Sequence, residues 1–401
     1  MKVFLLGAGA SKSYNDSPTG ETMPVALDFF QTFNKLTISE NPWVLIGALY
    51  GYLLEKGITD PYSYLDAGVD IEALYSEIEK ELKTDSNSSD YPLANMQARR
   101  AYTQLTFIFA STINEIQNGS PSQAHRKIAQ TLTADDAVIT FNWDTLMDRA
   151  LSIETEWCVD WGYGSIPYGI YSNGWRAPEP KASTGKAPRL IKLHGSTNWI
   201  TAYTIMDEGG NAKLTHELDP STLHVFEFSN EEYPCFQGRY MDGYEPFSFG
   251  YYPPNLQNIP SLAAPDGYVL FQAGLNAAFM QKGEASKEGL TSMPLIIPPV
   301  RNKTYDLFGG LFKDLWLEAE QILTLADEII IIGYSFPKTD SQSHELFKKA
   351  FSKKSSLPKI TIIDPNPNRI EDKFRFDFGI PSSHLKVITD YFSEKFDLSS
   401  L

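Results

Sequence analysis

Short, mostly apolar runs recur along the chain, and each of them ends in small or polar residues. They span 3–6, 137–141, 190–193, 294–299, 328–332, 359–364 and 385–388. Runs of this length without strict alternation are typical of strands covered on both faces. Helical patterns stand between them, as at 144–151, 311–325 and 340–351. Apolar strands that alternate with helices predict an α/β fold with a Rossmann-like, doubly wound, mainly parallel sheet.

Two stretches depart from this alternation. Residues 35–132 are mainly helical in pattern; Leu74 and Ile78, for example, stand at helical spacing behind Asp70 and Glu72. Residues 200–290 hold dense aromatic residues mixed with glycine and proline, above all between 226 and 252. We therefore predict a single domain over 1–401, with a helical subdomain at 35–132 and an insertion of short strands and loops at 200–290. Residues 157–188 are predicted to be irregular.

Polar residues or glycines follow five of the predicted strands. The first run leads into the turn Gly7-Ala8-Gly9-Ala10-Ser11, and the others end at Asn142, His194, Ser335 and Asp364. Ligands of doubly wound sheets bind beyond the carboxyl ends of the strands, so we expect these residues at one edge. A glycine-tight turn between strand and helix lets the backbone approach a pyrophosphate. This turn lacks a third glycine at the dinucleotide-fold spacing.

Composition and charge narrow the possible partners. The formal net charge of −16 over 401 residues opposes direct binding to nucleic acid or to an anionic membrane. Two cysteines, Cys158 and Cys235, exclude a four-thiolate zinc site and argue against a disulfide framework. The first residues do not form a secretory signal, and no apolar stretch has the ~18 residues of a membrane span. We expect a cytoplasmic protein that binds no membrane.

Taken one at a time, several of these residues are better explained by ordinary structural roles. Asn142 and Asp144 fit a strand-end turn in which Asp144 caps the next helix. A lone histidine such as His194 is commonly a buried structural side chain. Glu72 suits the start of a helix, where a negative charge is favourable. Ser335, before Phe336 and a proline, fits a turn.

Taken together and in order, the motifs resemble those of the sirtuins. The motifs are Gly7–Ser11 (GAGAS), Thr140–Asp144 (TFNWD), Lys192–Trp199 (KLHGSTNW), Gly333–Ser335 (GYS) and Ile363–Asn366 (IDPN). Their local form is most similar to the sirtuin-like (SIR2-like) NAD hydrolases of bacterial anti-phage defence. The resemblance covers residues 1–30, 136–200 and 290–366, and it leaves out the aromatic insertion. The sequence departs from the sirtuin pattern at Phe141, where a glutamine is usual, and it lacks the paired cysteines of the deacetylase zinc module.

The resemblance implies a site for NAD+ and a role for each matching residue. Asn142 would hold the nicotinamide ribose and an attacking water, Asp144 would bind the nicotinamide amide, and His194 would contact the ribose hydroxyls and take a proton. These three form the implied catalytic set. The implied cofactor-binding residues are Gly7, Ala8, Gly9, Ala10 and Ser11 at the pyrophosphate, Gly333 and Ser335 at phosphate and ribose, and Asp364 at the adenosine ribose. Asn366 is a further implied cofactor-binding residue.

The activity that the resemblance implies is hydrolysis of NAD+ to ADP-ribose and nicotinamide. In the family this depletes NAD+ and aborts infection. We expect no zinc and no cofactor beyond NAD+ as substrate. A homo-oligomer controlled by a separate sensor protein, such as a HerA-type ATPase, is the expected assembly. Alternatives are an NAD-dependent protein deacylase or ADP-ribosyltransferase, and a non-catalytic sensor of NAD or ADP-ribose.

Overall fold

A six-stranded parallel sheet forms the centre of the protein. The computed structural model describes residues 1–36, 42–84, 96–171, 175–179, 186–201, 204–207, 212–214, 223–227, 268–273, 278–281, 293–297, 310–337 and 340–398. The strands follow the order β15-β14-β13-β1-β2-β5, and every neighbouring pair is parallel. Their bounds are β1 Lys2–Leu6, β2 Ala137–Thr140, β5 Arg189–Lys192, β13 Glu328–Ile332, β14 Lys359–Ile363 and β15 Leu385–Ile388.

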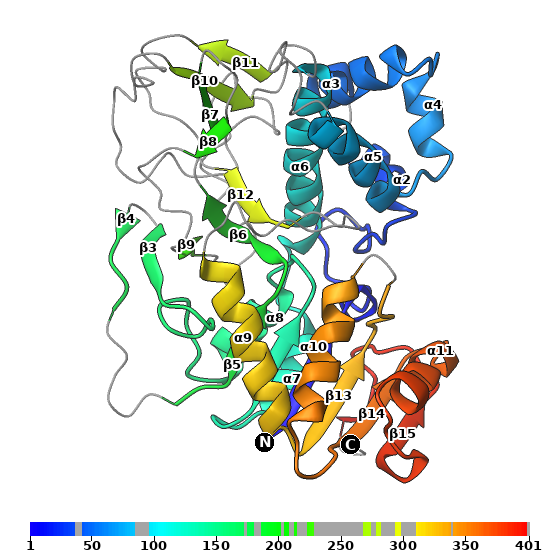
Figure 1. Ribbon diagram of the computed structural model, residues 1–401, viewed down its shortest axis with the longest axis vertical. Helices are drawn as coiled ribbons and strands as arrows, with labels where there is room; N and C mark the ends of the chain where they lie inside the picture. The colour runs from blue at the N-terminus through cyan, green and yellow to red at the C-terminus, as the bar shows by residue number, and fades with distance from the viewer. Residues whose placement is uncertain are drawn as a thin grey trace.

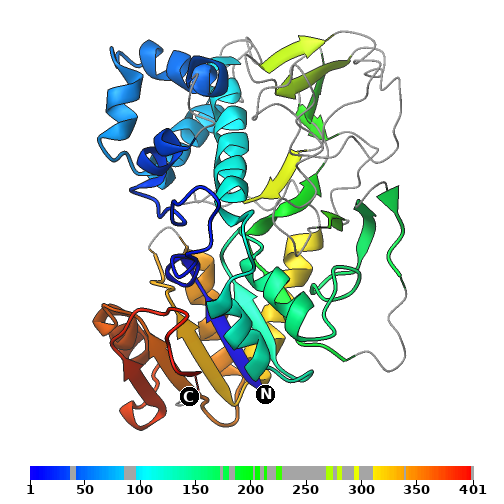
Figure 2. The ribbon, with the colours of Figure 1, turned by 180° about the vertical axis from the view of Figure 1, so that it is seen from behind.

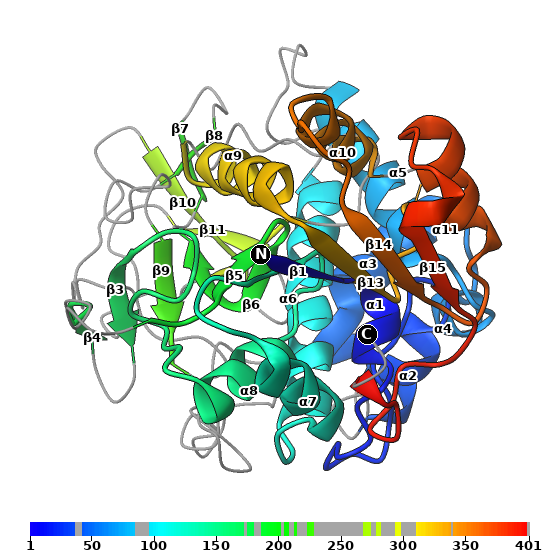
Figure 3. The ribbon, with the colours of Figure 1, turned by 90° about the horizontal axis from the view of Figure 1, so that it is seen from below.

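Helices cover both faces of this sheet. Helices α9 (Gly310–Leu325) and α10 (Ser341–Ser352) lie on one face, and α7 (Gln123–Thr131) and α8 (Leu146–Glu154) lie on the other (Figure 3). The central strands are accordingly buried along their length, as Val3–Leu6 and Ile329–Ile332 show. The predicted doubly wound, mainly parallel α/β fold is thereby confirmed, because consecutive apolar residues are what two covered faces require.

The strand order reverses at β1. The chain builds β1, β2 and β5 outward on one side and then crosses over to build β13, β14 and β15 on the other. In chain order this is the 3-2-1-4-5-6 arrangement of dinucleotide-binding folds, in which the ligand lies beyond the carboxyl ends at the reversal. Here the reversal lies between β1 and β13.

A helical layer stands over the carboxyl ends of the sheet (Figure 1). It is built from α2 (Phe29–Lys35), α3 (Pro42–Glu55), α4 (Pro61–Asp66), α5 (Ile71–Thr84) and α6 (Met96–Gln117). These helices share a second hydrophobic core that includes Phe29, Tyr75 and Phe109. Helix α7, near the end of the predicted subdomain, packs instead with the core of the main sheet through Ala124 and Ile128.

Two smaller sheets lie beside the helical layer, with α6 between them and the other helices (Figure 2). One has the order β12-β6-β9-β3-β4 and the other β11-β10-β7-β8. Their strands are β3 Pro167–Tyr171, β4 Trp175–Arg176, β6 Gly195–Thr201, β7 Thr204–Asp207, β8 Ala212–Leu214, β9 Leu223–Phe226, β10 Tyr268–Ala273, β11 Ala278–Gln281 and β12 Met293–Ile296.

These sheets correct one prediction. Residues 157–188 are not wholly irregular, because β3 and β4 pair as an antiparallel hairpin there. Most of the aromatic stretch at 226–252 lies outside the described residues. Smaller elements complete the chain: α1 (Ala8–Ser11), α11 (Asn368–Asp372), the π-helical turn η6 (Lys373–Asp377) and the 3-10 turn η7 (Ser382–His384). None of the described helices is long and apolar enough to cross a bilayer.

Candidate functional site

The turn after β1 packs tightly against the end of β13. A Cβ added to Gly7 would lie 2.5 Å from the Gly333 carbonyl oxygen, and one on Gly333 would lie 2.5 Å from the Ala10 nitrogen. The φ of Gly333 is +60°, a region that glycine alone adopts readily. The amides of Gly7, Gly9 and Ala10 donate to backbone carbonyls, those of Ile332, Gly333 and Gly7 respectively. These glycines therefore allow close packing at the reversal point, and their contact with a pyrophosphate stays a prediction.

Three polar side chains join the β1 turn to the end of β2. The Asn142 Nδ2 donates to the Gly7 carbonyl and to the Ser11 Oγ, both at 2.8 Å. The Ser11 hydroxyl donates in turn to Asp144 Oδ2 at 2.6 Å. All three side chains are buried, with Asn142 and Asp144 each 8% exposed. The structure thus brings together Ser11, Asn142 and Asp144, which the sequence assigned to one site.

Asp144 also has the structural role that its position suggested. Its Oδ1 accepts a hydrogen bond from the Leu146 amide at 3.1 Å, at the start of α8. Its two carboxylate oxygens therefore have different partners, one in the helix start and one in Ser11. The structure thus shows the structural role of Asp144, and its contact with a nicotinamide amide stays a prediction.

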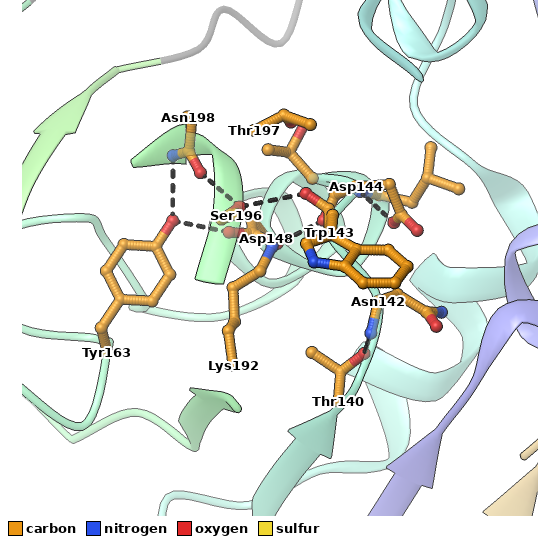
Figure 4. Close-up of polar contacts among 12 residues, drawn as sticks. Thr140, Asn142, Trp143, Asp144, Asp148, Tyr163, Lys192, Ser196, Thr197 and Asn198 are labelled. Atoms are coloured by element: carbon orange, nitrogen blue, oxygen red, sulfur yellow. Dashed lines mark hydrogen bonds and ion pairs between the residues drawn. The ribbon is translucent and has the colours of Figure 1, made fainter. Parts of the chain in front are cut away.

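A buried ion pair between Lys192 and Asp148 lies next to the turn that carries Asp144 (Figure 4). The Lys192 ammonium donates to the Asp144 carbonyl at 2.6 Å and to Asp148 Oδ2 at 2.9 Å. Both charged side chains are fully buried. Burial raises the pKa of Asp148, and the charge of Lys192 acts against this rise. Lys192, which the sequence analysis did not single out, ties the backbone of Asp144 to the core.

Hydrogen-bonded side chains extend this support. Tyr163 donates to Asp148 Oδ1 at 2.6 Å, and Asn198 Nδ2 donates to the Tyr163 hydroxyl at 3.1 Å. The Ser196 hydroxyl lies 2.7 Å from Asn198 Oδ1 and 3.2 Å from the Trp143 carbonyl oxygen, so its single proton is shared between these two acceptors (Figure 4). The Thr197 amide also donates to the Trp143 carbonyl, at 2.8 Å. The turn that carries Asn142 and Asp144 is therefore held by hydrogen bonds to the carbonyl groups of Trp143 and Asp144. These bonds fix the geometry of the turn, as a functional site requires.

His194 lies at the end of β5 in an aromatic environment. Its ring centroid is 5.2 Å from that of Phe141 and 5.8 Å from that of Trp143. Its Nε2 lies 3.5 Å from Asp340 Oδ2, which also accepts the Tyr334 hydroxyl at 2.6 Å. Both His194 and Asp340 are nearly fully buried. Asp340 was not predicted as a site residue, although an acidic residue between a strand end and the next helix was a usable signal.

The turn after His194 requires glycine. Gly195 has a φ of +78°, and a Cβ there would lie 2.1 Å from the Leu295 carbonyl oxygen. The Ile297 amide donates to the His194 carbonyl at 2.8 Å. The glycine lets the chain turn from the main sheet into β6 while the end of β12 closes over His194.

A pocket lies beyond the carboxyl ends of β1 and β2. It encloses about 590 Å³ of empty space, counting the part open to solvent, and Ala8, Ser11, Asn142, Trp143 and Asp144 form its inner wall. Its outer wall comes from the helical layer and the loop before α2, through Met23, Pro24, Val25, Ala26, Phe29, Ile71, Glu72, Phe109 and Ile113. His194 is not among the lining residues, since its ring packs against Phe141 and Trp143.

A second pocket lies on the other side of the reversal point. It encloses about 890 Å³ by the same measure, and its walls include Phe336, Asp340, Arg369 and Lys373. The predicted residues on this side line neither pocket. Ser335 and Asn366 are exposed and Asp364 is partly buried, with the Asn366 amide donating to Asp364 Oδ1 at 2.8 Å. Their roles stay predictions.

Comparison with known proteins gives little further support. No protein-family model and no curated protein matches the chain. Among solved structures, that of Sir2Tm bound to a propionylated peptide is 13% identical, with a TM-score of 0.34, over 98% of this chain and 88% of that chain. The Sir2-p53 peptide-NAD+ structure is also 13% identical, with a TM-score of 0.32, over 98% of this chain and 89% of that chain. At this level of similarity, the fold assignment rests on the sheet order alone.

Proposed function

We propose that the protein is an NAD+ glycohydrolase, which cleaves NAD+ to ADP-ribose and nicotinamide. One observation carries this proposal: a pocket beside the reversal point of a Rossmann-order sheet has a buried carboxamide and a buried carboxylate, Asn142 and Asp144, in its wall. Dinucleotides bind at this place in such sheets. The motif resemblance to the sirtuin-like NAD hydrolases supplies the reaction.

The main tasks of the protein in this reaction are to position the attacking water and to stabilise the positive charge on the ribose. Breaking the bond between the ribose C1′ and the ring nitrogen leaves both electrons on the ring, which departs as neutral nicotinamide. The positive charge left on C1′ and the ribose ring oxygen is met by water, whose oxygen bonds to C1′ and whose proton leaves. In this proposal Asn142 orients the water, Asp144 binds the nicotinamide side, and His194 takes the proton. A site fixed by Lys192 and Ser196 suits such positioning.

The remaining half of the dinucleotide would lie across the reversal point. In this proposal the pyrophosphate passes over the Gly7–Ser11 turn, and the adenosine half lies on the side of β13 and β14, near Ser335, Asp364 and Asn366. The second pocket, with Arg369 and Lys373 in its wall, is on this side and offers space for it.

We further propose that the activity serves anti-phage defence by depleting cellular NAD+. An enzyme of this kind must be held inactive until infection. The proposed control is assembly into a homo-oligomer with a separate sensor protein, such as a HerA-type ATPase. This proposal rests on the motif resemblance.

The test is the set of products formed from NAD+ by the purified full chain. Chromatography should show ADP-ribose and nicotinamide in equal amounts, with the chain alone or with the products of neighbouring genes. Asn142→Ala and His194→Ala should each lower nicotinamide release by about a hundredfold or more, as is usual for groups that position or accept a proton. His384→Ala is the matched control, because this histidine lies at the opposite edge of the sheet, just before β15.

The same assay separates the alternatives. A transferase would release nicotinamide in step with modification of an acyl-lysine or protein acceptor, with little free ADP-ribose from NAD+ alone. A sensor would bind NAD+ in a calorimetric titration and return it intact. Turnover that is unchanged in both the Asn142 and His194 variants, with both folded by circular dichroism, would rule out the proposed site.

A further inference from the structure

The last residue of α6, Gln117, contacts the turn between β2 and α8 from the helical layer. Its Oε1 accepts a hydrogen bond from the Thr145 amide at 2.7 Å, directly after Asp144 and at the start of α8. The Gln117 side chain is buried, so this bond is shielded from solvent. Helix α6 also lines the pocket, through Phe109 and Ile113. One helix therefore forms part of the outer wall and holds the backbone of the inner wall.

The carboxamide of Gln117 has a fixed orientation. Its Nε2 donates to Asn114 Oδ1 at 2.7 Å and to Thr197 Oγ1 at 3.2 Å, so both of its hydrogens and its oxygen have partners. Asn114 and Thr197 are fully buried. Thr197 is itself bonded to the turn, because its amide donates to the Trp143 carbonyl at 2.8 Å. Gln117 therefore cannot turn away from Thr145 without leaving buried polar groups unpaired, which is unfavourable.

Helix α8 makes a second set of hydrogen bonds to the end of α6. The guanidinium of Arg149, in α8, donates to the Gln117 carbonyl and to the Gly119 carbonyl, each at 2.7 Å. Arg149 is buried, and the carbonyl groups at the end of a helix carry partial negative charge, which attracts this cation. The end of α6 and the start of α8 are thus joined by donors from both sides. The position of the start of α8 therefore depends on that of α6.

Another buried glutamine on α6 shows what such a bond does within the helical layer. Gln104 and Gln117 are 5% and 3% exposed. The Gln104 Oε1 accepts the Leu49 amide of α3 at 3.0 Å, so its bond joins two helices of the same layer. The bond of Gln117 crosses from this layer to the turn that carries Asp144. The two glutamines therefore separate packing within the layer from an effect on the site.

We infer that Gln117 is a positioning residue, which fixes Asp144 through the Thr145 amide and makes its place depend on that of α6. The inference rests on the proposed function for the reaction that Asp144 serves. Asp144 precedes Thr145 in the chain, and its Oδ1 accepts the Leu146 amide at 3.1 Å, so its carboxylate moves with the first residues of α8. A misplacement of about 1 Å can cost about a hundredfold in rate. The helical layer thus sets the geometry of the site in addition to walling the pocket.

The test compares Gln117→Met with Gln104→Met in the full chain. Each variant keeps an unbranched side chain and removes the acceptor of one backbone amide. Hydrogen exchange at the Thr145 amide, followed by mass spectrometry with fragmentation, should become about tenfold faster in Gln117→Met and stay unchanged in Gln104→Met. The kcat for NAD+ hydrolysis should fall about tenfold to a hundredfold in Gln117→Met, with a smaller change in KM. In Gln104→Met it should fall less than about twofold.

A second variant covers the case in which Gln117→Met does not fold, as judged by circular dichroism. Thr197→Val keeps a branched side chain of similar size and removes one hydrogen-bond partner of the Gln117 amide. It should speed exchange at Thr145 and lower kcat by about threefold, the size of one neutral hydrogen bond.

The outcomes separate this inference from the proposed function. Exchange at Thr145 that is no faster in Gln117→Met than in the wild type, or faster exchange with the kcat of Gln104→Met, would each overturn the role of Gln117 and leave NAD+ hydrolysis in place. A wild-type chain that binds NAD+ and leaves it intact would reject the hydrolase. In that case weaker NAD+ binding by Gln117→Met than by Gln104→Met, measured by isothermal titration, would support the role, and equal binding would overturn it. A chain that neither binds nor cleaves NAD+ would reject both.

Discussion

Asp340 is a residue to which no role was assigned from the sequence and which the structure places beside His194. Its Oδ2 lies 3.5 Å from His194 Nε2, so its charge favours the protonated form of the imidazole. If His194 accepts a proton during hydrolysis, Asp340→Asn should lower NAD+ turnover about tenfold to a hundredfold, the loss expected when a buried charged group loses its partner. Nicotinamide release, followed by chromatography, measures this loss.

Tyr334 provides the matched control for Asp340. Its hydroxyl donates to the same Asp340 oxygen at 2.6 Å, and its ring stacks on Phe141 with centroids 4.1 Å apart. Tyr334→Phe removes this hydrogen bond and keeps both the ring and the carboxylate. It should retain most of the activity. Equal losses in the two variants would show that Asp340 acts by holding the local structure together and has no separate effect on His194.

Among the elements, the β1 turn and the end of β13 make one of the closest backbone contacts of the site. Gly333→Ala adds a methyl group 2.5 Å from the Ala10 nitrogen, on a backbone with φ of +60°. We expect it to lower the free energy of unfolding by about 3 kcal/mol, as the sum of overpacking and backbone strain. Urea unfolding, monitored by circular dichroism, measures this change.

Gly379→Ala separates the two causes. Gly379 has a similar φ of +69°, but nothing lies within 4 Å of an added Cβ. This control should lose only about 1 kcal/mol, from the strain of the left-handed conformation. If the two variants were equally destabilised, the close packing of the two strand ends would contribute nothing.

The strands of the main sheet were predictable because a strand buried on both faces needs consecutive apolar residues, which can be recognised in the sequence. The run Ile329–Ile332 has no polar interruption, and it forms β13 where the sequence placed it. The strand around Leu295 was predicted as well, but its partner was not. It pairs antiparallel with β6 in a separate sheet, which local apolar character does not specify.

The residues at the strand ends were predictable for a similar reason. Asn142, which lines the pocket, and His194, which does not, both follow strands directly, so the topology of the sheet brings them to one edge. Glu72 and Phe109 come from the helical layer, and only tertiary packing puts them against the strand ends. Asp340 lies in the connection between β13 and α10, where the sequence has no helical or strand periodicity. Nothing in the sequence therefore indicated that its carboxylate lies close to His194.

At the scale of the whole molecule, the buried His125 links stability to pH. It lies in α7, against the main sheet, and is 1% exposed. Burial lowers its pKa to about 4, although the charge of Asp144 acts in the opposite direction. In the unfolded chain a histidine titrates near 6.5, so the unfolded state takes up the proton first as the pH falls. The stability that His125 contributes is complete above about pH 6.5 and is lost progressively towards pH 4.

Replacement of His125 should therefore flatten the pH profile of stability. Between pH 7.5 and pH 5 the wild-type chain should lose about 2 kcal/mol more than His125→Gln, which keeps a neutral side chain near the Ser122 hydroxyl. Urea unfolding of both proteins at the two pH values measures the difference, and the contributions of other titrating groups cancel between them. His384→Gln, at a histidine outside the core, should follow the wild type. Equal losses in His125→Gln and the wild type would mean that acid destabilises this fold through other groups, with the imidazole in α7 accessible to protons in the folded state.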